Sequence, residues 1–295
     1  MRLASRRERQ RLLASAFDSG ITHFDVARMY GVGQAEAELG RFARARRADI
    51  TIATKFGIEP RKGLLPLARL QGPARAVLNA LPALRGAIKR RGDLIDASRH
   101  YDARTARRSL EESLSQAGTD YFDILFVHGP RPTDEVKLEE LVAFFADAQR
   151  EGKIRSWGIA SEDSRGAALV DAFGNSAVLQ TRYDVFSPIS PSVSVGRPLI
   201  LFGFLASALP RLTHCVAADP RIREKLLPIE AGDTCAAIAD YLLLDALDAY
   251  ENSVLLVSTT RPARIKHAAE VARNMNHADL PDFRMLLKDA GVLPS

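Results

Sequence analysis

Four side chains that could together supply a proton to a substrate follow strand-like segments of this sequence. Asp25 and, five residues later, Tyr30 lie at the end of the first such segment. Lys55 ends the second segment and His128 ends the third. A phenol, with a pKa of about 10, is a poor acid at neutral pH, but a nearby ammonium group favours the phenolate and lowers that pKa. A carboxylate beside the ammonium group would keep it charged, so the four residue types predict a site for proton transfer.

Each of these residues also has an ordinary structural explanation when it is taken alone. An aspartate after a strand is commonly a cap or turn residue, a lysine a solvated strand end, and a histidine a hydrogen-bonded core group. The joint arrangement favours chemistry. A pKa shift of about two to three units corresponds to roughly 3–4 kcal/mol, which a close charge in a partly dry pocket can supply.

Strand-like and helix-like segments alternate along the chain. The strand-like segments are 22–26, 50–55, 122–128, 156–160, 177–181, 199–204 and 253–258, and amphipathic stretches of helical length lie at 104–117, 138–151 and 234–249. Such alternation predicts βα units and a parallel sheet. At 295 residues, with no linker rich in Pro, Gly or Ser, we expect an α/β fold with a single (β/α)8 TIM-type barrel domain over residues 1–295. Active sites of such barrels lie at the carboxyl ends of the strands, where the four residues are found.

Several motifs identify the family that the chain resembles. They are Asp25-Val26-Ala27-Arg28-Met29-Tyr30-Gly31 with Glu36, Leu39 and Gly40; Thr54-Lys55-Phe56-Gly57; Asp120-Tyr121-Phe122-Asp123; and Gly152-Lys153-Ile154-Arg155 with Gly158 and Ile159. Over most of residues 12–185 the chain resembles the aldo-keto reductases. The resemblance implies that Asp25, Tyr30, Lys55 and His128 form a catalytic tetrad. It also implies hydride transfer between NADP(H) and the carbonyl or alcohol group of an aldehyde, ketone or sugar, with Tyr30 as general acid or base.

The same resemblance implies a set of residues that bind the cofactor. Ser161 and Gln180 would bind the nicotinamide carboxamide, although Glu162 stands where asparagine is common, and Tyr183 is either close to the nicotinamide ring or a core aromatic. The segment Ser258-Thr259-Thr260-Arg261 with Arg264 opens a helix, and hydroxyls, backbone N–H groups and guanidinium groups there suit a phosphate. A 2′-phosphate clamp favours NADPH over NADH; the alternative for Arg264 is a solvated helix residue.

A glycine-containing segment near the start of the chain only partly matches a dinucleotide-binding fingerprint. Gly31-Val32-Gly33-Gln34-Ala35-Glu36 begins like the dinucleotide fingerprint G-x-G-x-x-G but has Glu36 in place of the third glycine. We therefore expect no phosphate site at this segment.

The resemblance has one departure at the amino end. Members of the family begin with a strand that carries Gly-x-Gly-Thr, whereas this chain starts at the helix that follows, so seven strands are expected. Either the true start lies upstream, or the barrel is open at a seam where a strand edge would be exposed.

The positive charge of the chain is concentrated in one segment. The formal net charge is +5 and the pI is about 9.3. The segment from residue 57 to residue 104 alone contains ten Lys and Arg residues and four acidic residues. No aromatic residues interleave with these charges as a base-stacking surface requires, so we expect no nucleic-acid partner. We interpret residues 58–103 as a basic insertion or lid after the strand that carries Lys55. Its field selects an anionic or polyhydroxylated substrate, or it is merely solvated.

Composition excludes other classes. No apolar run approaches the roughly 18 residues of a membrane span, and no signal peptide is present. Two cysteines, Cys215 and Cys235, give neither a disulfide framework nor metal-ligand spacing, so we expect a cytoplasmic protein without a metal, acting on a small carbonyl compound. The alternatives are a catalytically weak or inactive member that serves as a nicotinamide-dependent sensor or interaction module, and a truncated, inactive product. A barrel isomerase or hydrolase would leave Tyr30 and Lys55 unexplained.

Overall fold

The computed structural model describes residues 5–31, 33–59, 98–162, 169–174, 176–226, 233–250, 252–274 and 283–293. The chain divides into two compact units. One holds the described residues up to 14 and those from 22 to 160, and the other holds residues 15–21 and those from 161 onward. Each unit is described by itself, and the single domain over 1–295 stays a prediction.

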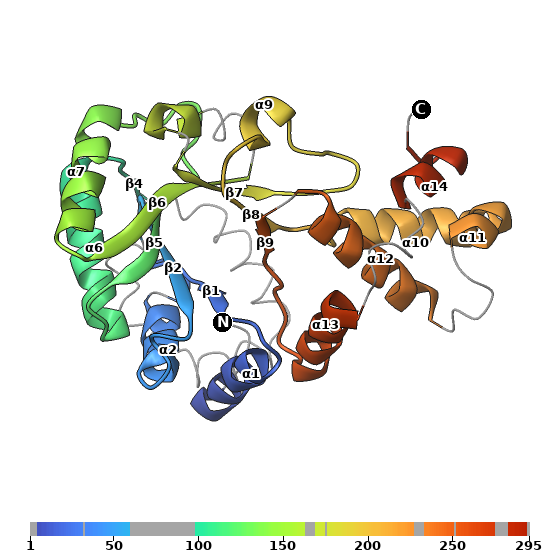
Figure 1. The fold of residues 1–295 in the computed structure, drawn as a ribbon, viewed down its shortest axis with the longest axis horizontal. Helices are drawn as coiled ribbons and strands as arrows, with labels where there is room; N and C mark the ends of the chain where they lie inside the picture. Colours follow the sequence, from blue (N-terminus) through green and yellow to red (C-terminus); the bar gives the residue numbers. More distant parts are fainter. Residues whose placement is uncertain are drawn as a thin grey trace, which may run out of the picture. The chain divides into compact units, whose positions relative to one another are not determined.

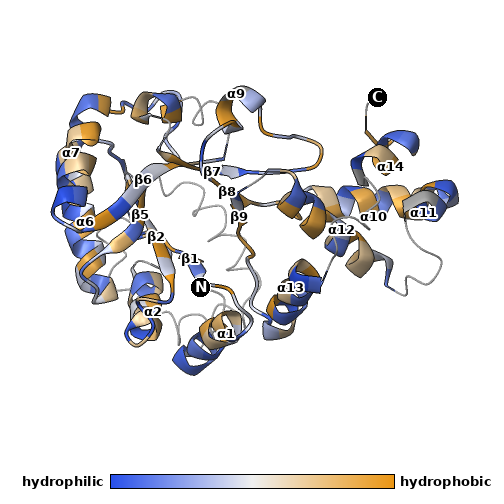
Figure 2. Cartoon of the chain, in the orientation of Figure 1, coloured by the Kyte–Doolittle hydropathy of each residue, from blue (hydrophilic) through white to orange (hydrophobic). Residues whose placement is uncertain are grey.

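The first unit is built on parallel strands with helices beside them. The strands are β1 (His23–Asp25), β2 (Thr51–Phe56), β5 (Phe122–His128) and β6 (Ile154–Ser161), and the helices are α1 (Arg6–Asp18), α2 (Gln34–Ala43), α6 (Ala103–Ala117) and α7 (Leu138–Arg150). The strands are hydrogen-bonded in the order β1-β2-β5-β6. Figure 1 shows α6 and α7 side by side along the strands of this unit. In Figure 2 these helices carry both apolar and hydrophilic residues, as expected for helices with one buried side.

Aromatic side chains fill the space between α7 and the strands. Phe56, Phe144 and Phe145 pack edge to face or tilted, and Phe145 stacks on Trp157 with ring centroids 5.6 Å apart. Phe56 and Phe145 are almost fully buried, and burying rings of this size is among the largest single apolar contributions to a core. This packing fixes the strands whose carboxyl ends carry Lys55 and His128.

Helix α6 has clear start and stop signals. Asp102 accepts a hydrogen bond from the backbone N–H of Thr105 (2.8 Å) and one from its hydroxyl (3.0 Å), which caps the first turn. Gly118 ends the helix with φ of 62°, a conformation that glycine adopts without strain. The helix is therefore held at a defined place against α2 and α7.

Gly40 of α2 allows a close approach to α6, and its replacement is expected to be costly. A Cβ atom built on Gly40 would lie 1.7 Å from the carbonyl oxygen of Ala117, so the two backbones would have to separate. We predict that Gly40→Ala lowers the free energy of unfolding by roughly 2–4 kcal/mol, measured by urea denaturation. The control is Gly152→Ala, where no atom lies within 4 Å and only the positive φ of 72° adds strain. Equal losses in the two variants would contradict the prediction.

The second unit has three parallel strands and several helices. The strands, in hydrogen-bonded order, are β7 (Val178–Arg182), β8 (Leu199–Phe202) and β9 (Ser253–Leu255). The helices are η2 (Leu169–Phe173), α9 (Pro191–Ser194), α10 (Ala208–Ala218), α11 (Pro220–Leu226), α12 (Thr234–Asp248), α13 (Pro262–Asn274) and α14 (Phe283–Asp289). Helix α12 packs against α10, α13 and α14, which gives this unit its own core.

All seven strands and all three amphipathic helices that the sequence predicts are present. The largest difference in bounds is at β9, which ends at Leu255, three residues before the predicted end. A short antiparallel hairpin, β3 (Ile58–Glu59) with β4 (Ser98–Arg99), was not predicted. Residues 60–97, which make up most of the expected basic lid, lie outside the described residues. No helix in the described part of the chain is long and apolar enough to cross a membrane.

Candidate active site

Asp25 and Lys55 form a buried ion pair at neighbouring strand ends. Asp25 is the last residue of β1 and lies opposite Ala53 of β2, two residues before Lys55. The Lys55 ammonium group donates to Asp25 Oδ1 and, at 3.2 Å, to the carbonyl oxygen of Val26. Only 4% of Lys55 is exposed, and burial lowers its pKa, whereas the Asp25 carboxylate acts in the opposite direction. The ammonium group is thus kept from water, and the partly buried carboxylate is the group that keeps the lysine charged.

Tyr30 projects from the tight loop that follows β1. Its backbone N–H donates to Ala27 (2.9 Å), and that of Gly33 donates to Arg28 (2.9 Å), so the loop closes on itself. The side chain is 41% exposed, and its ring centroid lies 5.6 Å from Lys55 Nζ. A phenol that is accessible on one side and faces an ammonium group on the other is suited to exchange a proton with a bound molecule.

His128 completes the group at the carboxyl end of β5. Its ring meets the Tyr30 ring edge to face, with centroids 6.1 Å apart. Burial, together with the positive charges of Lys55 and Arg99, lowers the pKa of His128 to about 3. At neutral pH the imidazole is therefore uncharged and can donate one hydrogen bond. The structure brings together the four residues that the sequence singled out.

This low pKa makes the stability of the fold depend on pH. Below about pH 6.5 the unfolded chain binds a proton at His128 that the folded protein does not take up until about pH 3, so stability falls as the pH drops through this range. Between about pH 7 and about pH 5 we predict that His128→Gln loses roughly 1–2 kcal/mol less stability than the wild type, measured by urea unfolding. His214→Gln, at an exposed position, is the control. Identical pH profiles for wild type and His128→Gln would contradict the assignment.

Glu36, which replaces the third glycine of the dinucleotide fingerprint, lies in a buried environment. This residue lies in the first turn of α2, is 1% exposed, and accepts a hydrogen bond from the Thr54 hydroxyl (2.7 Å). Burial raises the pKa of its carboxyl. A buried carboxyl group thus stands at the position where a dinucleotide fingerprint has its third glycine.

Two residues beside the site were not predicted. The Tyr101 hydroxyl donates to the carbonyl oxygen of His128 (2.8 Å), and Arg99 donates to that of Gly129 (2.7 Å). In the sequence Arg99 is only one charge of the basic segment, and Tyr101 precedes the cap of α6. No spacing rule places them against a strand end that comes much later in the chain.

Three predicted cofactor residues lie in strands β6 and β7 or just after them. Ser161 ends β6 and Gln180 is the middle residue of β7, and both polar side chains are almost fully buried. Tyr183 follows β7 and is 1% exposed; its hydroxyl donates to Asp245 and accepts from Arg284 (2.6 Å). Burial raises the pKa of Tyr183, and the adjacent Asp245 carboxylate adds to the shift. This placement favours the core-aromatic interpretation of Tyr183.

The predicted phosphate-binding residues lie between β9 and the first turn of α13. Ser258, Thr260, Arg261 and Arg264 are exposed, and the Thr259 hydroxyl accepts from the backbone N–H of Arg261 (3.1 Å). Neither guanidinium group forms an ion pair with any other described residue. Free guanidinium groups beside the N-terminus of a long helix match the donor set that a phosphate requires.

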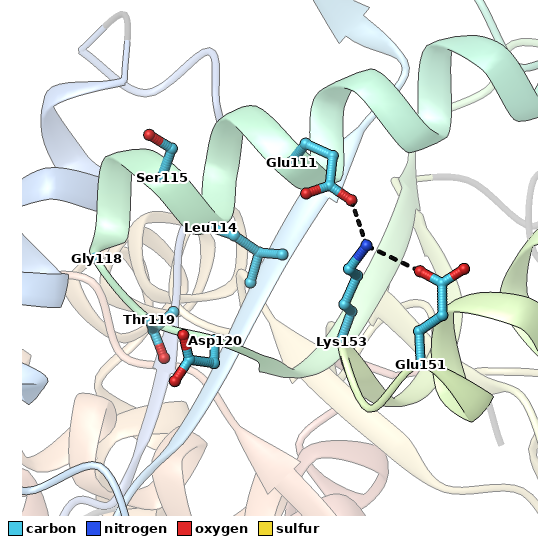
Figure 3. A pocket seen from close by; sticks show the side chains of 8 residues that line it. All are labelled: Glu111, Leu114, Ser115, Gly118, Thr119, Asp120, Glu151 and Lys153. Atoms are coloured by element: carbon cyan, nitrogen blue, oxygen red, sulfur yellow. Dashed lines mark hydrogen bonds and ion pairs between the residues drawn. The ribbon is translucent and has the colours of Figure 1, made fainter.

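A hollow of about 560 Å³ in the first unit lies away from these strand ends. Figure 3 shows its lining: Glu111, Leu114, Ser115, Gly118, Thr119, Asp120, Glu151 and Lys153. Lys153 bonds Glu111 (2.7 Å) and Glu151 (2.8 Å) across it. Asp120 and Lys153 precede β5 and β6, so the hollow is at the amino ends of the strands, whereas the four candidate catalytic residues are at the carboxyl ends. Within the described ranges, no group of three or more His, Cys, Asp or Glu residues is arranged to hold a metal.

Solved structures place the fold. An aldo-keto reductase from Bacillus halodurans in its holo form matches with a TM-score of 0.70 at 17% identity, over 98% of this chain and 88% of that one. An aldo-keto reductase from Klebsiella pneumoniae in complex with NADPH gives a TM-score of 0.65 at 19% identity, over 98% and 86%. The fold is therefore of the (β/α)8 barrel type that the sequence predicts, with seven strands and their helices among the described residues.

Sequence comparison supplies the family. L-glyceraldehyde 3-phosphate reductase of Escherichia coli (strain K12) is 32% identical over 156 residues, which are 51% of this chain and 35% of that protein. The chain spans only 35% to 45% of the length of this reductase and of two further curated relatives. The model of the aldo/keto reductase family matches residues 3–193, well over half of the chain and all four strand-end residues. The chain therefore belongs to the aldo/keto reductase family.

Proposed function

We propose that this protein reduces the carbonyl group of a small aldehyde, ketone or sugar with NADPH, and that Tyr30 is the general acid. The proposal rests on the arrangement of Asp25, Tyr30, Lys55 and His128 at or just after the ends of β1, β2 and β5. There an accessible phenol faces a buried ammonium group and an uncharged imidazole. Membership of the aldo/keto reductase family supports the same reaction.

Each member of the group has a distinct task in this reaction. Tyr30 donates a proton to the carbonyl oxygen, and Lys55 stabilises the phenolate that remains. Asp25 keeps the ammonium group charged and directed toward the ring, since an isolated buried ammonium would lose its proton. His128 donates a hydrogen bond to the same carbonyl oxygen and fixes its position. In the oxidative direction Tyr30 acts as the base.

The described residues fit a nicotinamide dinucleotide phosphate. When bound, the nicotinamide supplies the hydride that the carbonyl carbon accepts. Ser161 and Gln180 offer buried polar groups for its carboxamide. The exposed guanidinium groups of Arg261 and Arg264, at the start of α13, offer donors for the 2′-phosphate. The contact of Tyr183 with the nicotinamide ring stays a prediction from the sequence. In the structure its hydroxyl is already hydrogen-bonded to Asp245 and Arg284.

The phosphate-binding role predicts a specific change in cofactor preference. Replacement of Arg261 and Arg264 together by Ala should raise the KM for NADPH by roughly 10- to 50-fold and leave the KM for NADH unchanged. Steady-state kinetics with both cofactors measures this. Arg273→Ala, at the other end of α13, is the matched control. An equal loss with NADPH and NADH would show that these arginines do not read the 2′-phosphate.

The reaction itself is tested with purified protein, NADPH and a panel of aldehydes, ketones and phosphorylated or free sugars. Loss of NADPH absorbance that depends on the carbonyl compound is the expected result. NADPH binding without turnover on any compound would favour a nicotinamide-dependent sensor or interaction module. Absence of binding would favour an inactive product. The single barrel domain over 1–295, the lid role of 58–103 and a cytoplasmic location belong to the proposal and await their own tests.

A further inference from the structure

The short hairpin β3–β4 brings two unassigned residues to the end of β5. Ile58 pairs with Arg99, and the backbone N–H of His100 donates to the Gly57 carbonyl (3.0 Å). This pairing places Arg99 and Tyr101 directly after the strand end that carries Lys55.

The Tyr101 side chain packs between the end of β2 and the end of β5. Its side chain is 2% exposed, and its ring lies so close to Gly57 that an added Cβ there would be 2.2 Å from the ring. Its hydroxyl donates to the carbonyl oxygens of His128 (2.8 Å) and Gly129 (3.3 Å). The backbone carbonyl of Tyr101 accepts a hydrogen bond from the backbone N–H of Lys137 (3.0 Å), so the backbone of Tyr101 is also held in place.

Arg99 binds the same turn of backbone. Its guanidinium group donates to the Gly129 carbonyl (2.7 Å) and to the Tyr101 hydroxyl (3.2 Å), and Asp134 lies 3.9 Å away. Two carbonyl groups in succession, those of His128 and Gly129, are thus held by side chains. These carbonyl groups belong to the two peptide planes that follow the Cα atom of His128. Holding them therefore also sets the direction in which the imidazole side chain projects from the backbone.

We propose that Arg99 and Tyr101 are positioning residues that hold the imidazole of His128 in the orientation in which it binds a substrate carbonyl oxygen. The proposal rests on the proposed reductase function for its kinetic consequence, but the clamp on His128 is a property of the protein alone. Neither residue touches the reacting atoms. Their effect passes through the backbone of His128 and Gly129.

The charges around His128 give a second way to observe the clamp. Among the described residues, the Tyr30 ring from the loop after β1 contacts the imidazole, and the charges of Lys55 from β2 and Arg99 from β4 act on it. Burial is the largest cause of the low pKa of His128, followed by the charge of Lys55 and then that of Arg99. Removal of the Arg99 charge is therefore expected to raise the pKa of His128, whereas removal of the Tyr101 hydroxyl leaves the number of charges unchanged.

The test uses the full chain with the variants Arg99→Gln, Arg99→Lys and Tyr101→Phe. Arg107→Gln and Tyr121→Phe are matched controls, because the Arg107 guanidinium pairs with Asp147 and Glu151 and the Tyr121 hydroxyl accepts from Arg155, away from the end of β5 that carries His128. We expect kcat to fall about tenfold in Arg99→Gln and in Tyr101→Phe, with the KM for NADPH unchanged and partial recovery in Arg99→Lys. NMR titration of the His128 ring, with exposed His214 as internal reference, should show a higher pKa in Arg99→Gln and altered ring shifts in Tyr101→Phe.

Each result decides the proposal. Wild-type kcat and wild-type His128 signals in both variants would overturn it. A lower kcat with unchanged His128 signals would also overturn it, because the loss would then be structural and not transmitted through the imidazole. If the wild type reduces no carbonyl compound, the proposed function fails, and the His128 titration alone decides whether the clamp exists. Should Tyr101→Phe fail to fold, Arg99→Gln and Arg99→Lys carry the test.

Discussion

Tyr30→Phe is expected to lower kcat for carbonyl reduction by roughly 10²- to 10⁴-fold, the range over which a positioned general acid contributes. The substitution removes an accessible phenol hydroxyl whose ring centroid lies 5.6 Å from Lys55 Nζ, while it keeps the ring against His128. Because the ring is kept, the fold and the affinity for NADPH should be unchanged. The measurement is NADPH oxidation at saturating carbonyl compound, with NADPH affinity followed by fluorescence.

The control for this experiment is Tyr121→Phe, which removes a hydroxyl that accepts from Arg155 (3.1 Å) before β5 begins. This variant should keep wild-type kcat. If Tyr30→Phe also retained kcat within about twofold, proton donation would have to be assigned to another group. If NADPH affinity fell together with kcat, the loss would reflect binding and not proton transfer.

The strand ends could be predicted from sequence because their pattern is local. The segments at 22–26, 50–55 and 122–128 are short strand-like runs with Asp25, Lys55 and His128 at or next to their last residue, and in a parallel sheet all carboxyl ends lie at one edge. The sequence alone therefore predicts that Asp25, Lys55 and His128 lie together. The long, strongly amphipathic helices α6 and α7 were equally accessible to this reasoning.

The hairpin β3–β4 could not be predicted in this way. Its strands are two residues long, and many residues separate Glu59 from Ser98, so neither alternation nor turn chemistry marks it. Its position depends on tertiary contacts of the Tyr101 ring with Gly57 and of the Tyr101 hydroxyl with the end of β5. The clamp on His128 was missed for the same reason.

The buried cluster around Tyr183 shows the same limit in the second unit. Tyr183, Asp245 and Arg284 come from three distant parts of the sequence, and only the fold brings their hydroxyl, carboxylate and guanidinium groups into contact. Taken as a residue after a strand, Tyr183 is equally compatible with a cofactor contact and with the core. Asp245 and Arg284 supply the partners that a buried hydroxyl needs, which favours the core interpretation, and contact of the ring with a nicotinamide stays a prediction.

The buried ion pair predicts a second large effect, on stability as well as on rate. Lys55→Met removes the ammonium group and leaves the Asp25 carboxylate without its buried partner. Loss of one member of such a pair costs roughly 3–5 kcal/mol, because the remaining carboxylate loses the ammonium group that offsets its desolvation. We therefore expect the free energy of unfolding in urea to fall by about this amount. We also expect kcat to fall roughly 10²-fold or more.

The double variant Lys55→Met with Asp25→Asn separates the two effects. Without a carboxylate to strand, stability should recover by at least about half of the loss, since replacing both members of a buried pair is often close to neutral. Activity should not recover, because no ammonium group remains to stabilise the phenolate of Tyr30. Recovery of both quantities would mean that Lys55 serves only to neutralise Asp25. Recovery of neither would mean that the methionine disturbs the packing of β2 against Phe126 and the neighbouring core, and that the ion pair is not the source of the stability loss.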